Sequence, residues 1–212
     1  MSPELSYGRH AGPPRWDARR AAVQVLLYCD QGEWYLPLTL RPRHLARHAG
    51  QICLAGGSVE PGESERECAW REWCEELGEP GGTWQWVGEL PTTFVFASNF
   101  LIAPQVSVAS QRPRYQLNAS EVAEVVELPV RALFQHELRG GHLERRGPLC
   151  FEAPHFQWNE HRIWGATALI LEMFLRTLSH GDDSLIRKTA PPGAARFGTD
   201  VGGDIFKAAR GG

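Results

Sequence analysis

The sequence has little lysine and no long hydrophobic run. Only two of its 22 basic residues are lysines, Lys188 and Lys207, so arginine supplies almost all of the positive charge. No stretch approaches roughly 18 consecutive apolar residues, and the polar N-terminal segment lacks the apolar centre of a secretory signal. The 25 acidic residues bring the net charge to −3. We therefore expect neither a membrane-bound protein nor a nucleic-acid-binding one.

Cysteine is also sparse. The chain has five cysteines with no CxxC pair, and an odd number argues against a disulfide framework. Without paired ligands, a zinc site is not expected either. We interpret the cysteines as buried apolar residues, and the simplest location for such a protein is the reducing cytoplasm.

The composition predicts one folded domain between two loose ends. An apolar fraction of 42% and a charged fraction of 22% exclude wholesale disorder. Residues 1–19 are polar and rich in Gly, Pro and Arg, and residues 181–212 contain Gly and Pro with little periodicity. We predict a flexible lead-in over 1–19, a domain over 20–180 and a flexible tail over 181–212.

Short strands and a few helices are expected within that domain. Residues 138–158 are rich in turn signals and could hold further strands, and Pro37 suits only a strand edge or a bulge. Mixed elements of this kind favour a single α/β or α+β domain. The expected strands are 21–28, 34–40, 84–87, 94–96, 100–108 and 122–128, and the expected helices are 65–77, 129–134 and 163–178.

A basic segment precedes an acidic helix. The stretch 35–52 contains no acidic residue, whereas acids crowd the segment after it. Ser64 and Glu67 form a capping box, and Gly78 is a typical helix stop. These signals predict a helix over 65–77.

Three acids share one face of this helix. Glu72, Glu75 and Glu76 are related by the i, i+3 and i+4 spacing. Their mutual repulsion would be relieved by a divalent cation such as Mg²⁺, which prefers oxygen ligands. The alternative is a solvated acidic face with no ligand.

The spacing around these acids resembles the Nudix box, G-x5-E-x7-R-E-U-x-E-E-x-G-U. The seven characteristic positions are occupied by Gly57, Glu63, Arg71, Glu72, Glu75, Glu76 and Gly78. Trp73 takes the first apolar position, and Glu79 departs from the aliphatic residue usual at the last. The resemblance implies a Nudix-type α/β/α sandwich with a mixed β-sheet, and an enzyme that hydrolyses a pyrophosphate linkage in a small-molecule diphosphate.

The resemblance also implies a metal site. Glu72 and Glu76 would be the principal ligands of Mg²⁺ or Mn²⁺, and Glu75 would bind a second ion or a metal-bound water. The backbone carbonyl of Gly56 would complete the coordination shell.

Two further roles follow from the family pattern. Glu63 and Arg71 would form an ion pair that ties the glycine loop to the helix. Either Glu75 or a late glutamate, for which Glu121 is the candidate, would accept the proton of the attacking water.

The segment 38–57 resembles the signature of coenzyme A pyrophosphatases, L-L-T-x-R-[SA]-x3-R-x3-G-x3-F-P-G-G. The matching residues are Thr39, Arg41, Gly50, Gly56 and Gly57. Pro42, Ala46 and Leu54-Ala55 depart from it, and Ala46 stands where an arginine is usual. The implied products are 4′-phosphopantetheine and adenosine 3′,5′-bisphosphate.

Substrate phosphates would then be bound by Arg41, Arg43, Arg47 and the backbone at Gly57. A solvated basic loop is the alternative for the arginines. ADP-ribose or a nucleoside triphosphate is the alternative substrate, and a catalytically silent Nudix-fold binding module is the alternative class of protein. The sequence makes no prediction of the oligomeric state.

Overall fold

The computed structural model describes residues 14–96, 98–146 and 149–179. The predicted tail and most of the predicted lead-in lie outside these ranges. Within them, no helix is long and apolar enough to cross a membrane.

The main sheet is mixed, as predicted. Its central path runs β3-β2-β1-β7-β5, with β4 on β1, β6 on β7 and β8 on β2. β1 and β7 are parallel over Arg19–Tyr28 and Phe100–Ala109, and the other pairs are antiparallel. The strands are β1 (Arg19–Asp30), β2 (Glu33–Leu40), β3 (Ile52–Cys53), β4 (Gly56–Ser58), β5 (Trp84–Glu89), β6 (Thr93–Val95), β7 (Phe100–Ala109) and β8 (Glu124–Pro129).

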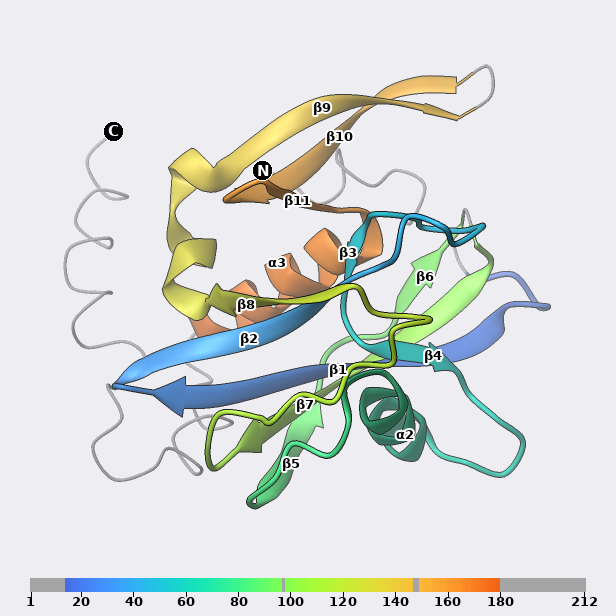
Figure 1. The fold of residues 1–212 in the computed structure, drawn as a ribbon. Coiled ribbons are helices and arrows are strands. Elements are labelled where there is room, and N and C mark those ends of the chain that lie inside the picture. Colours follow the sequence, from blue (N-terminus) through green and yellow to red (C-terminus); the bar gives the residue numbers. More distant parts are fainter. Residues whose placement is uncertain (1–13, 97, 147–148, 180–212) are drawn as a thin grey trace.

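A second, antiparallel sheet follows the main sheet. The short 3₁₀ turns η1 (Val130–Phe134) and η2 (His136–Leu138) lead into β9 (Arg139–Arg146), β10 (Leu149–Trp158) and β11 (His161–Trp164). The chain then enters helix α3 (Gly165–Ser179), which contacts β10, β11 and η1. Figure 1 shows α3 and helix α2 (Glu65–Leu77) on opposite sides of the main sheet.

The central strand β1 is apolar on both faces because each face is covered by a helix. Leu26 and Tyr28 lie in one buried cluster with Trp73 of α2. The alternate residues Val25 and Leu27 lie in a larger cluster that includes α3 side chains. A strand places successive side chains on opposite faces, so this alternation builds two cores. The structure is therefore the predicted α/β/α sandwich.

Helix α2 has the predicted bounds and caps. Ser64 Oγ accepts from the Glu67 amide at 3.3 Å, and the Glu67 carboxylate accepts from the Ser64 amide at 2.8 Å. At the other end, Gly78 has φ +79°, and a Cβ there would lie 2.8 Å from the Cβ of Gln116. A side chain at residue 78 would thus be both strained and obstructed.

Several boundaries differ from the predictions. Ile163 and Trp164 belong to β11 and not to the last helix, which starts at Gly165, where φ is +66°. The predicted helix at 129–134 is a 3₁₀ turn, whereas the further strands expected as possible in 138–158 are present as the long β9–β10 hairpin. A short apolar run is compatible with either a helix or a strand, and whether it forms a strand depends on the segments available to pair with it.

Pro37 lies inside β2. The pairing of β2 with β1 runs from Glu33 to Tyr35, so at Pro37 the backbone is paired on the β8 side, opposite Glu127. Proline has no N–H to donate, and at Pro37 strand β2 is no longer paired with β1. On that side the position resembles a strand edge, as expected.

The prediction for the cysteines was wrong in part. Only Cys68 is fully buried, whereas Cys29, Cys53 and Cys74 are intermediate and Cys150 is exposed. All five are free thiols.

Candidate active site

Two glycines place the backbone of β4 against β1 and α2. Gly56 and Gly57 pair with Val23 and Ala22 of β1. A Cβ on Gly56 would lie 2.3 Å from the Ala22 carbonyl oxygen, and one on Gly57 would lie 2.2 Å from Oε1 of Glu72. A side chain at Gly56 would meet the backbone of β1, and one at Gly57 would displace the Glu72 carboxylate, so the backbone of the glycine loop lies directly beside that carboxylate.

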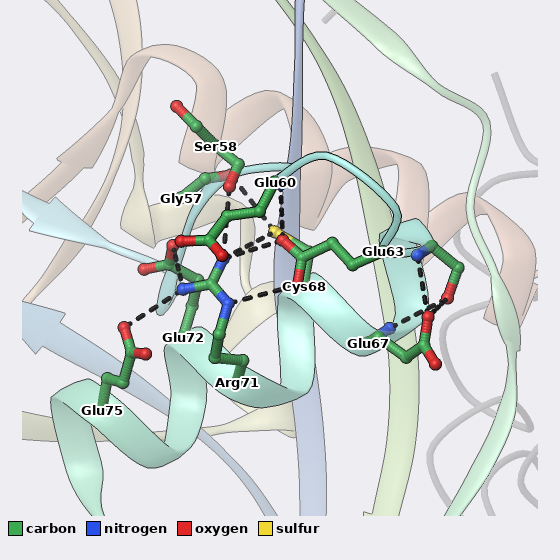
Figure 2. A network of polar contacts seen from close by, with 10 residues as sticks. Gly57, Ser58, Glu60, Glu63, Glu67, Cys68, Arg71, Glu72 and Glu75 are labelled. Atoms are coloured by element: carbon green, nitrogen blue, oxygen red, sulfur yellow. Dashed lines mark hydrogen bonds and ion pairs between the residues drawn. The ribbon is translucent and has the colours of Figure 1, made fainter.

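Arg71 lies between three acids, Glu63, Glu72 and Glu75 (Figure 2). Its Nη2 donates to Glu63 Oε1 at 2.9 Å, and its Nε donates to Glu63 Oε2 at 3.2 Å. Nη1 donates to Glu72 at 2.9 Å and to Glu75 at 3.1 Å, and Nη2 also reaches the Ser58 carbonyl at 3.2 Å. The structure thus contains the expected ion pair with Glu63 and adds two acids to it.

The ion pair also closes the glycine loop. Glu63 Oε1 accepts from the Glu60 amide at 2.7 Å, so one carboxylate joins the loop backbone to the helix. The hydrogen bonds from Arg71 lower the pKa of Glu63 to about 2, against the opposing effect of burial. This carboxylate therefore stays charged throughout the physiological range.

The three acids of α2 predicted to bind metal are Glu72, Glu75 and Glu76, called the acidic cluster below. They differ in environment. The side chain of Glu75 is 56% exposed and that of Glu72 is 15% exposed, whereas Glu76 is only 2% exposed. Glu76 Oε1 accepts from the Gly56 amide at 3.1 Å. Burial raises the pKa of Glu76 to about 7, opposed by this hydrogen bond and by the charge of Arg41. Burial also raises the pKa of Glu72, opposed by Arg71.

The donor chemistry fits a hard divalent cation. Glu72 and Glu76 offer carboxylate oxygens one helical turn apart, with the loop backbone at Gly56 beside them. Within the described residues, no three His, Cys, Asp or Glu side chains converge to hold an ion as they stand. Arg71 engages Glu72 and Glu75, so the use of these two acids as ligands requires their carboxylates to turn away from the guanidinium.

The segment 110–123 brings Glu121 to this cluster. The Asn118 amide donates to the Glu76 carbonyl at 3.0 Å, and the Gln116 amide donates to the Leu77 carbonyl at 2.8 Å. The charge of Glu121 contributes to the raised pKa of both Glu72 and Glu76. The late glutamate singled out in the sequence is therefore a neighbour of the acids on α2.

The basic segment contributes its arginines unequally. Arg41 is half-buried, exchanges backbone hydrogen bonds with Gly50 and Gln51, and acts electrostatically on Glu76. Its Nε is buried and has no hydrogen-bond partner among the described residues. Arg43 and Arg47 are exposed on the turn that Arg41 begins. Of the three, only Arg41 is shown beside the acidic cluster.

Cys53, which lies near Arg41, and its neighbour Thr167 had no signal in the sequence. Cys53 of β3 is close to Arg41 and to Thr167 in the first turn of α3. Burial raises the pKa of Cys53 to about 11, so its thiol is neutral at physiological pH. No local motif links β3 with α3, because the two are more than a hundred residues apart.

The profile of the NUDIX domain matches residues 18–145, which is more than half of the chain. The chain belongs to the Nudix family. It is therefore a Nudix pyrophosphohydrolase that acts on small-molecule substrates, in a family that generally uses divalent metals. An enzyme is thereby favoured over a silent binding module.

Named relatives lie in the same family. The chain is 32% identical over 174 residues to an uncharacterized Nudix hydrolase, NudL, of Pectobacterium atrosepticum, covering 78% of this chain and 86% of the relative. It is 33% identical over 165 residues to the human mitochondrial coenzyme A diphosphatase NUDT8, covering 76% and 70%. Among solved structures, a MutT/nudix family protein from Enterococcus faecalis has a TM-score of 0.49 at 16% identity, covering 82% of this chain and 67% of that one.

Proposed function

We propose that this Nudix hydrolase cleaves the diphosphate of coenzyme A or its derivatives, giving 4′-phosphopantetheine and adenosine 3′,5′-bisphosphate. The observation that carries the proposal is the position of Arg41, whose buried Nε has no partner in the described residues and whose charge acts on Glu76. A guanidinium there is suited to a substrate phosphate near the acidic cluster. The match of Thr39, Arg41 and Gly50 to the coenzyme A signature, and the relative named a coenzyme A diphosphatase, support the same substrate.

In this proposal Glu72 and Glu76 hold Mg²⁺ or Mn²⁺, with Glu75 and the Gly56 carbonyl as further ligands. With a divalent cation bound there, charge on the diphosphate would be neutralised and the pKa of an attacking water would be lowered. Arg41 binds a phosphate, Arg43 and Arg47 extend the positive surface, and the backbone at Gly57, which has no side chain, lets the substrate approach closely. Glu63 and Arg71 orient the loop and the helix.

The proton of the attacking water goes to a carboxylate. Glu75 and Glu121 are the two candidates. Glu75 is exposed and hydrogen-bonded to Arg71, whereas the charge of Glu121 acts on both Glu72 and Glu76, and its backbone is joined to that of Glu76 through Asn118. This placement favours Glu121 as the base.

Substrate class is tested by comparing coenzyme A, dephospho-coenzyme A and ADP-ribose. A charge-assisted arginine contact contributes roughly 1.5–3 kcal/mol, so loss of the 3′-phosphate should lower kcat/KM about tenfold to a hundredfold. Arg41→Ala should weaken turnover of coenzyme A, whereas Arg131→Ala, which removes an exposed arginine paired with Glu33, should not. If ADP-ribose is the best substrate and coenzyme A is left intact, the coenzyme A proposal fails and the Nudix assignment stands.

Gly57→Ala tests the close approach of the loop to the metal ligands. The added methyl would meet the Glu72 carboxylate, so we expect this side chain to be displaced and Mn²⁺ affinity to fall by about tenfold. Gly62→Ala is the control in the same loop, since a Cβ there has nothing within 4 Å, although its φ of +91° adds strain. Isothermal titration with Mn²⁺ decides. Equal affinities of the two variants would contradict the placement of Glu72.

A further inference from the structure

The segment 110–123 is fastened to the main sheet through one carboxylate, Glu127 of β8. Glu127 Oε1 accepts from the Tyr115 hydroxyl at 3.0 Å and from Arg112 Nε at 3.0 Å. Its other oxygen accepts from Arg112 Nη2, and Tyr28 of β1 donates a further hydrogen bond to Oε1. Two of the three donor residues belong to the segment, and the third belongs to the central strand.

Glu127 and its three donor residues, Tyr28, Arg112 and Tyr115, are called the Glu127 node below. At this node the Glu127 carboxylate is held as an anion. Burial acts to raise the pKa of Glu127, but hydrogen bonds from Arg112, Tyr28 and Tyr115 outweigh it and lower that pKa. Burial and the neighbouring carboxylate both raise the pKa of Tyr28 and of Tyr115, so both phenols keep the protons they donate. The node therefore holds one arrangement of donors and acceptor across the neutral pH range.

Beyond the node, the same segment covers the C-terminal end of α2. The amides of Gln116 and Asn118 satisfy the carbonyls of Leu77 and Glu76, which a helix end leaves without internal partners. Asn118 then receives the amides of Glu121 and Val122 on its carbonyl, and Ala123 donates to Leu40 of β2 at 2.8 Å. One continuous set of contacts thus leads from Glu127 to Glu121 and to the backbone of Glu76.

We propose that Glu127 is a positioning residue, which holds the segment 110–123 against α2 and so fixes Glu121 beside Glu72 and Glu76. Glu127 itself does not touch the substrate or the metal in this scheme. The inference rests on the proposed metal site, because that site gives the placement of Glu121 its purpose.

The test uses Glu127→Gln and Arg112→Gln in the full chain. The first replaces the anion by an amide of nearly equal shape, and the second removes the donor from an exposed side chain of the segment. Glu172→Gln is the matched control. It breaks a half-buried pair with Arg139 on the opposite face of the sheet, where Glu172 is 19% exposed compared with 21% for Glu127.

Two measurements are made without substrate. In hydrogen exchange, both test variants should speed exchange at the amides of Gln116, Asn118 and Ala123 by about tenfold to a hundredfold, while the control leaves them unchanged. In Mn²⁺ titration, both should bind more weakly by about tenfold, the lower end of the range for groups that surround metal ligands, because the negative charge of Glu121 would no longer be held near Glu72 and Glu76. A double variant with Glu121→Gln should bind no more weakly than Glu121→Gln alone, since Glu127 acts through Glu121.

The outcomes are separable. Unchanged exchange in the Glu127→Gln variant overturns the proposal, as does faster exchange with unchanged Mn²⁺ affinity, because either breaks the path from the node to the metal acids. Additive losses in the double variant also overturn it. A wild-type protein that binds no Mn²⁺ overturns the proposed metal site, and with it the role of Glu127 there, and this failure is recognised before any variant is made.

Discussion

Glu76→Gln is expected to lower turnover by about a hundredfold or more while the fold stays intact, a loss of about 2.7 kcal/mol of transition-state stabilisation. Glutamine has almost the same shape, and its carbonyl oxygen can still accept from the Gly56 amide, which lies 3.1 Å from Glu76 Oε1. What is lost is the negative charge that would hold the metal ion. Glu72→Gln should have a similar effect for the same reason.

Glu76→Gln should stabilise the metal-free protein at high pH, although it lowers turnover. Burial raises the pKa of Glu76 from its ordinary value of 4.5 to about 7. A carboxyl whose pKa is raised by folding stabilises the protein at low pH relative to high pH, and this contribution is lost as the pH rises from about 4.5 through about 7. At pH 8 without metal, Gln should therefore raise the Tm, because it removes a buried charge that the Gly56 amide and Arg41 compensate only in part.

Turnover with Mg²⁺, circular dichroism and thermal melting in chelator check both expectations. Glu79→Gln is the matched control, since Glu79 is an exposed acid just past the end of α2 and outside the proposed ligand set. Near-normal turnover in both Glu72→Gln and Glu76→Gln would contradict the metal assignment. A lowered Tm for Glu76→Gln in chelator would show that its charge is not the destabilising one.

Arg71→Ala should reduce both activity and stability. The guanidinium is 26% exposed and serves Glu63, Glu72, Glu75 and the Ser58 carbonyl, so its loss leaves two carboxylates of 15% exposure without their cation. Removing one partner of a buried pair costs about 3 kcal/mol, which corresponds to a fall in Tm of about 6–12 °C for a domain of this size. Turnover should fall as well, because the glycine loop is no longer tied to the helix.

The comparison with Arg71→Lys separates charge from geometry. Lysine keeps the positive charge, but its single ammonium group cannot donate to all the acceptors that the planar guanidinium serves. We therefore expect a Tm between those of the wild type and Arg71→Ala. Arg15→Ala removes an exposed arginine paired with Asp17 and should change the unfolding free energy by less than about 0.5 kcal/mol. Differential scanning calorimetry measures all three. A Tm for Arg71→Ala equal to that of the wild type would show that Arg71 does not support the loop.

Helix α2 shows what the sequence by itself determined. The capping box, the glycine stop and the shared face of Glu72, Glu75 and Glu76 all depend on contacts within a few residues along the chain. Local hydrogen bonding and helical periodicity therefore predicted its bounds, and the box spacing identified the family. The strands at 21–28 and 34–40 were likewise predicted to within a few residues, because their apolar runs are bounded by turn residues.

Only the tertiary structure decided how the acids differ from one another. Neighbouring glutamates on one helix have the same local pattern, yet Glu76 is buried under the glycine loop and Glu75 is exposed. The position of Glu121 beside them depends on the path of residues 110–123 and on the node at Glu127. The charge of Arg41 acts on Glu76 because β2, which ends just before Arg41, and β4, which follows it, belong to one sheet. These relations arise from strand pairing and burial between segments that are far apart in the sequence, so they cannot be predicted from any short stretch of it.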